Sequence, residues 1–153
     1  MCMNKYKILS VSLLLMILAV CVSSFSGKKN LAGNGIDFIE QDWNKALSTA
    51  KNTNKLVFID IYATWCGPCK MLKNKTFADK KVAEFFNQNF VNVSVDAEKG
   101  VGIELSNKYA VSAYPTLVFT DSKGNPVLYS VGYMSGSELM AFAKAALKKA
   151  EKK

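Results

Sequence analysis

Residues 56–70, LVFIDIYATWCGPCK, constrain the fold more than any other segment, because an apolar run there leads directly into two closely spaced cysteines. Residues 56–62 are β-branched and aromatic and nearly continuously apolar, which is the pattern of a strand covered on both faces. Asp60 is the one carboxylate in this run. Burying a charge is costly unless it is paired, so Asp60, Cys66 and Cys69 are the first candidates for a functional site.

The rest of the chain alternates between helical and extended patterns. Helices are predicted over residues 36–53, 79–89 and 101–109, from Ser135 onward, and from Cys66 or Gly67 to a break near Phe77. Strands are predicted at residues 90–95, 116–120 and 127–131. Strands separated by helices require parallel crossovers, whereas the turn residues 121–126 favour a closing antiparallel hairpin. The predicted fold class is therefore α/β, a mixed sheet with helices on both faces.

Residues 1–26 are predicted to be a secretory signal peptide. Lys5 and Lys7 precede an apolar run at residues 8–22, which is shorter than the roughly 20 residues of a membrane span and is followed by small polar residues. The end of this run also resembles a lipoprotein signal, in which Cys21 would carry a lipid anchor. In the alternative, Cys21 leaves with the signal. Residues 27–35 are then a flexible lead-in to a domain at residues 36–153.

The net charge of +8 comes entirely from lysine, because the chain contains no arginine. Bidentate recognition of guanine usually falls to arginine, and the lysines form no stripe interleaved with aromatic residues. A nucleic-acid partner is therefore not expected, and the lysines are interpreted as solvated surface.

The cysteine pair has few chemical uses in this chain. If Cys2 and Cys21 leave with the signal peptide, the mature chain has two thiols and no histidine, which are too few for the four ligands of a zinc site. A Cys–His hydrolase lacks its imidazole for the same reason, and a disulfide that closes so short a loop adds little stability. Dithiol–disulfide exchange remains, with no metal and no cofactor expected beyond the Cys66–Cys69 disulfide itself.

The local sequence suits that exchange. A cysteine at the start of a helix has its thiolate stabilised by free backbone amides and the helix dipole, so Cys66 is the expected nucleophile. Cys69, one turn further along, is expected to be more buried and to resolve the mixed disulfide. Gly67 permits close backbone approach, and Pro68 fits the first helical turn, where its missing N–H is not needed.

WCGPCK at residues 65–70 resembles the active-site sequence of the thioredoxin family. Asp60 lies where that family has a buried aspartate. VSAYPTLVF at residues 111–119 is similar to the segment that carries the family's cis-proline, and VGYMSGSEL at residues 131–139 to its final glycine-to-helix turn. The resemblance covers residues 56–147 and implies the thioredoxin fold, a central mixed β-sheet of about four to five strands flanked by helices on both faces.

The resemblance also implies roles for single residues. Asp60 would accept the proton of Cys69, and Tyr114-Pro115 would be a cis bond that lies against the disulfide and pairs with an extended substrate. Trp65 would shield the site, and Gly132 would permit close approach near it. The alternatives are a solvent-exposed Asp60 at a strand end, an ordinary turn proline, a core tryptophan and a plain turn glycine.

Two departures from the family pattern bear on the chemistry. Cytosolic members have a lysine near the buried aspartate where this chain has Asn92, so Asp60 is expected to be harder to ionise. Tyr114 is larger than the isoleucine common before the cis-proline, which would change which substrates dock. Residues 76–96 resemble the exported thioredoxin-like proteins of Gram-negative bacteria.

These observations predict a periplasmic thiol:disulfide oxidoreductase that reduces disulfides in exported proteins. The expected electron donor is a membrane-embedded disulfide transporter, and the expected oligomeric state is a monomer. The alternatives are a disulfide oxidase or isomerase, a reductase dedicated to cytochrome c maturation, and a redox-inert binding module or chaperone with the same fold.

Overall fold

The structure is a computed structural model, and it describes residues 35–152. The predicted signal peptide, Cys21 and residues 27–34 of the predicted lead-in lie outside the described residues. Within residues 35–152, no helix has the length and apolar character needed to cross a membrane.

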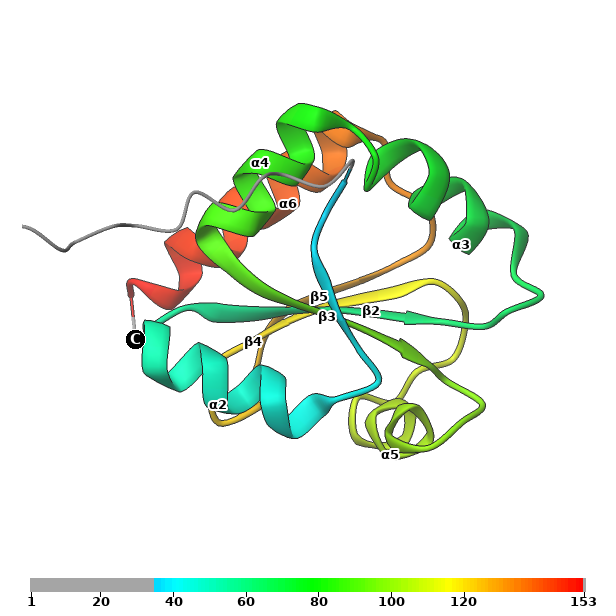
Figure 1. The fold of residues 1–153 in the computed structure, drawn as a ribbon, viewed down its shortest axis with the longest axis horizontal. Coiled ribbons are helices and arrows are strands. Elements are labelled where there is room, and N and C mark those ends of the chain that lie inside the picture. Colours follow the sequence, from blue (N-terminus) through cyan, green and yellow to red (C-terminus); the bar gives the residue numbers. More distant parts are fainter. Residues whose placement is uncertain (1–34, 153) are drawn as a thin grey trace, which may run out of the picture. The chain divides into compact units, whose positions relative to one another are not determined.

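Five strands form one mixed sheet in the order β1-β3-β2-β4-β5 (Figure 1). The strands are β1 (Phe38–Glu40), β2 (Leu56–Tyr62), β3 (Phe90–Asp96), β4 (Thr116–Thr120) and β5 (Pro126–Val131). Strands β1 and β2 run parallel to β3, whereas β4 is antiparallel to both β2 and β5. The predicted mixed sheet and its closing hairpin are confirmed.

Helices cover both faces of this sheet (Figure 1). The helical segments are α2 (Trp43–Thr53), α3 (Gly67–Met71), the π-helical turn η1 (Leu72–Thr76), α4 (Lys80–Asn89), α5 (Val101–Lys108) and α6 (Gly136–Ala150). The buried side chains of α2 and α5 pack against one face. Those of η1, α4 and α6 pack against the other, around the fully buried ring of Phe58. The capping box predicted at the start of the last helix is present, formed by Ser135 and Glu138.

The first predicted element is wrong in part. Residues 36–53 were expected to be one helix, but β1 comes first, and α2 begins only at Trp43 with Asp42 as its N-cap. Gln41, with φ of 55°, turns the chain between the two elements. The apolar residues before Trp43 fit helical spacing as well as a short edge strand, and the pairing of β1 with β3 decides between them.

Helix α5 lies unusually close to the end of β3. A Cβ atom added at Gly102 would overlap the backbone carbonyl of Asp96. This carbonyl belongs to the strand end itself, so it cannot move aside as a flexible side chain could.

Gly102→Ala is therefore expected to lower the free energy of unfolding by about 2 kcal/mol or more. The neighbouring Ile103 is 48% exposed, and Ile103→Ala is expected to change stability by no more than about 0.5 kcal/mol. Urea denaturation of both variants measures the difference. Equal stabilities would contradict the close packing of α5 on β3.

Candidate active site

Cys66 and Cys69 form a disulfide with an S–S distance of 2.03 Å where β2 leads into α3. Cys66 is the N-cap of α3, and its Sγ accepts a hydrogen bond from the backbone N–H of Cys69 at 3.1 Å. Pro68 lies in the first turn of α3, as predicted. A sulfur that accepts a backbone N–H at a helix start is in the right place to carry negative charge.

Two expectations about this motif differ from the structure. Cys69 was expected to be more buried than Cys66, but Cys69 is 7% exposed and Cys66 only 3%. Ala63 and the partly buried Tyr62 and Tyr114 pack around both sulfurs. The expected close backbone approach at Gly67 is also absent within the described chain, because a Cβ there would meet no atom within 4 Å.

Tyr114-Pro115 is a cis peptide bond, as the resemblance implies, and Pro115 is buried. The carbonyl of Pro115 accepts a hydrogen bond of 2.8 Å from the backbone N–H of Gly132. Gly132 has φ of 99°, a conformation that side chains rarely adopt, but a Cβ there would again meet no atom within 4 Å. Gly132 is therefore required by the turn, and the expected close approach to this glycine is not found.

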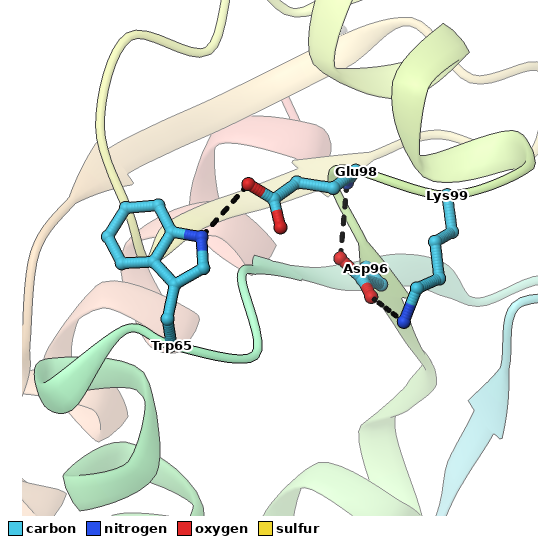
Figure 2. Close-up of polar contacts among 4 residues, drawn as sticks. All are labelled: Trp65, Asp96, Glu98 and Lys99. Carbon is cyan, nitrogen blue, oxygen red and sulfur yellow. Dashed lines mark hydrogen bonds and ion pairs between the residues drawn. The ribbon is translucent and has the colours of Figure 1, made fainter.

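Trp65 is 66% exposed, so its interpretation as a core tryptophan is wrong. Its indole Nε1 donates a hydrogen bond of 2.9 Å to Oε1 of Glu98 (Figure 2). The Trp65 ring also meets Tyr114 edge-on, with 5.9 Å between ring centroids. Trp65 and Tyr114 thus form an aromatic wall beside the disulfide.

A buried carboxylate at the end of β3 holds the partner of Trp65 in place. Asp96 Oδ1 accepts the backbone N–H of Glu98 at 3.1 Å, and its Oδ2 pairs with Lys99 Nζ at 3.1 Å (Figure 2). Sequence reasoning did not identify these residues as part of the site. The available signal was Asp96 itself, a carboxylate closing a buried strand.

Asp60 is only 7% exposed, so the alternative of a solvent-exposed carboxylate is wrong. Its Oδ2 accepts a hydrogen bond of 3.2 Å from Ser94 Oγ. Its buried Oδ1 has no hydrogen-bond partner among the described residues. The pKa of Asp60 is raised from 3.8 to about 7, and desolvation by burial is the main cause. The Ser94 hydrogen bond lowers this pKa, the charge of Glu40 raises it, and the charge of Lys73 lowers it. A pKa near 7 suits a group that must accept and release a proton at neutral pH.

Asn92 does not contact Asp60, because its Nδ2 donates instead to Asp37 O at 3.3 Å and to Asn87 Oδ1 at 3.2 Å. A cation nevertheless acts on the Asp60 carboxylate. Lys73 acts on it from η1, the helical layer that covers this face of the sheet. The sequence argument considered only the strand position and so missed Lys73.

The comparisons with known proteins agree with this geometry. The sequence profile of the thioredoxin-like domain family matches residues 43–147. Thiol:disulfide interchange protein DsbD of Vibrio vulnificus (strain CMCP6) is 35% identical over 108 residues, which are 69% of this chain and 17% of that protein. The chain thus spans less than a fifth of the DsbD relatives that it matches. Thioredoxin of Mycoplasmoides gallisepticum is 35% identical over 105 residues, 66% of this chain and 95% of the relative.

A solved structure from Bacteroides thetaiotaomicron, described as a disulphide-isomerase, is 45% identical with a TM-score of 0.68. The match covers 76% of this chain and 96% of that one. The five-stranded sheet with its flanking helices is therefore a thioredoxin fold.

The buried Asp60 carboxylate is expected to destabilise the folded protein at alkaline pH. Between pH 4 and 7 the unfolded chain releases the Asp60 proton while the folded chain retains it, so stability falls as the pH rises through this window. Asp60→Asn should raise the free energy of unfolding of the oxidised protein by up to about 4 kcal/mol at pH 8 and change it little at pH 4. Urea denaturation at both pH values tests this, with the exposed Glu104→Gln as control. An effect of Asp60→Asn that does not depend on pH would contradict the assignment.

The Glu98 hydrogen bond is expected to restrain the Trp65 ring. Trp65 and Trp43 are the two tryptophans of the chain, so Trp43→Phe leaves Trp65 as the single tryptophan. In that background Glu98→Ala, which removes the acceptor, should speed the fluorescence anisotropy decay of Trp65. Glu98→Gln retains an acceptor oxygen and should leave the decay close to that of the parent. Identical decays in all three proteins would show that the bond does not hold the ring.

Proposed function

Because the chain belongs to the thioredoxin-like domain family, we propose that it reduces disulfides in exported proteins in the periplasm of a Gram-negative bacterium. Its relatives include thioredoxin and thiol:disulfide interchange proteins, and the chain is a thiol:disulfide oxidoreductase. One observation carries the proposed mechanism. The Cys66–Cys69 disulfide begins α3, and Cys69 lines the same cavity as the buried Asp60.

In the proposed cycle, Cys66 of the reduced protein attacks as a thiolate. It bonds to one sulfur of the substrate disulfide, and the other substrate sulfur leaves as a thiolate. The product is a mixed disulfide between Cys66 and the substrate. Asp60 then takes the proton of Cys69, through water in the cavity that the two residues share. The Cys69 thiolate attacks Cys66 Sγ, and the second substrate thiolate leaves and takes up a proton. The substrate gains two electrons, and the protein keeps the Cys66–Cys69 disulfide.

The proposed substrate docks beside Trp65 and Tyr114. Both rings flank the disulfide, and Trp65 offers an exposed apolar surface. Strand β4 begins directly after Pro115, and Tyr114 packs against the two cysteines. In this proposal an extended substrate segment pairs with backbone groups at this point. Tyr114 narrows this region more than a small side chain would, so it is a candidate for substrate selection.

The direction of electron flow rests on the residues between the thiols. Gly67 and Pro68 separate them, and the chain has no histidine that would stabilise the Cys66 thiolate. This composition supports a potential near the value of about −270 mV for thioredoxin, far from about −120 mV for a strong periplasmic oxidant. The proposed electron donor is a membrane-embedded disulfide transporter. The proposal of export rests on the N-terminal sequence. A lipid anchor at Cys21 is a variant of this proposal. The proposed oligomeric state is a monomer.

A second candidate function is disulfide isomerisation. The Bacteroides thetaiotaomicron protein with 45% identity is described as a disulphide-isomerase. The two functions differ in the redox state that the protein must hold, because an isomerase works at a higher potential than a reductase, near −180 mV.

The first test is the redox equilibrium of Cys66 and Cys69 against glutathione. A potential near −270 mV supports the reductase, whereas one above about −180 mV would overturn the proposed direction in favour of an oxidase or isomerase.

Cys66→Ser is expected to abolish the reduction of insulin disulfides, because it removes the attacking sulfur. Cys69→Ala should instead accumulate mixed disulfides with substrates, which electrophoresis without reductant resolves. Many trapped partners indicate a general reductase, and a single one a reductase dedicated to one client, such as cytochrome c maturation. Full insulin reduction by Cys66→Ser would show that Cys66 is not the attacking sulfur. A wild-type protein that reduces no insulin, together with a Cys66→Ser variant that keeps its affinity for a partner, would point instead to a binding module or chaperone.

A further inference from the structure

Three strands place Glu40, Ser94 and Asp60 in one row across the sheet. In the parallel pairs of β3, Ser94 is opposite Glu40 of β1 on one side and opposite Asp60 of β2 on the other. Paired residues of a sheet project from the same face, and neighbouring strands are about 4.8 Å apart. Glu40 and Asp60 are therefore two strand spacings apart, roughly 10 Å between backbones, on the face that α3 and η1 cover.

A cavity of about 290 Å³ lies along this row. The sheet contributes Glu40, Asp60 and Ser94 to its lining, and the helical layer contributes Cys69 and Lys73. It is large enough for several water molecules. The unpartnered Oδ1 of Asp60 is the kind of buried polar atom that such water would satisfy.

Two residues of opposite charge, on different elements of the fold, act on the ionisation of Asp60. Glu40 on β1 acts against ionisation of Asp60, and Lys73 on η1 acts in favour of it. Lys70 of α3 and Tyr62 of β2 also line the cavity, and the charge of Asp60 contributes to the raised pKa of Tyr62. On β3, Asp96 is paired with Lys99, and β4 presents the neutral Leu117 opposite Asp60.

We propose that Glu40 and Lys73, which face Asp60 from the sheet and from the helical layer, are an opposed pair of positioning charges that sets the pH at which Asp60 can take the proton of Cys69. Lys73 thus supplies from a helix the cation that Asn92 does not supply from the strand. Glu40 offsets it, so that Asp60 can both hold and release a proton near neutral pH. This inference rests on the proposed function for its catalytic meaning, but the charge pair itself can be tested without turnover.

The test is a pH titration of the Asp60 carboxyl group in the oxidised protein, followed by ¹³C NMR after expression of the full chain with labelled aspartate. Asp60→Asn identifies the signal. Glu40→Gln should lower the midpoint by roughly 0.3 to 1 pH unit, and Lys73→Met should raise it by a similar amount, as expected for charges at about 10 Å between water-like and protein-like dielectric constants. The double variant should return close to wild type, and 0.5 M salt should shrink both shifts.

Lys75→Met is the matched control, because Lys75 is an exposed lysine of the same helical turn that does not line the cavity. It should leave the midpoint unchanged. Shifts of the same sign in Glu40→Gln and Lys73→Met, shifts no larger than that of Lys75→Met, or none at all would overturn the proposal.

The pH dependence of insulin reduction separates this inference from the proposed function. Under both, the acidic limb of the rate profile moves with the NMR midpoint, toward lower pH in Glu40→Gln and higher pH in Lys73→Met. NMR shifts as expected in a protein that reduces no disulfides would support the charge pair and overturn the reductase. A rate profile that ignores the NMR shifts would overturn the step from Cys69 to Asp60.

Discussion

Strand β2 is hydrogen-bonded to β3 on one side and to β4 on the other, and helices cover both of its faces. Any polar side chain on it must find its partners inside the protein, because water does not reach it freely. Asp60 finds one partner, Ser94, and leaves one oxygen to a cavity. Its raised pKa follows from this incomplete solvation. β2 ends shortly before Cys66, so the strand that buries the Asp60 carboxylate also places it near the Cys66–Cys69 pair.

Segments far apart in the sequence meet around this strand end. The start of α3 holds the disulfide, the loop before β4 brings Tyr114 to it, and the turn after β3 holds Trp65 through Glu98. Each segment follows or precedes a strand of the same sheet, so the sheet fixes their mutual distances. The proposed mechanism needs this arrangement, because in it the nucleophile, the docking surface and the proton acceptor act on one substrate bond.

Local patterns predicted the elements whose sequence allows one conformation. The apolar run of β2, the hairpin of β4 and β5, and the capped start of α6 all belong to this group. β1 was missed because the apolar residues Ile36, Phe38 and Ile39 fit a helix equally well, and only the pairing of residues 38–40 with the edge of β3 makes a strand there. The relative burial of the two cysteines was misjudged, because it depends on packing from Tyr62, Ala63 and Tyr114.

The sequence by itself determined the motif and the chemistry that this motif predicts. Cys66 and Cys69 at helical spacing, a carboxylate six residues before the first of them and the absence of histidine favour disulfide exchange as the use of the pair. Only the tertiary structure decided which charges act on that carboxylate. The register of two parallel strand pairs places Glu40 in the same row of the sheet as Asp60. The packing of a helical segment on the sheet brings Lys73 to the cavity that Asp60 lines. Spacing along the chain carries no information on such distances, because electrostatic effects depend on separation in space and on the solvent excluded between the groups.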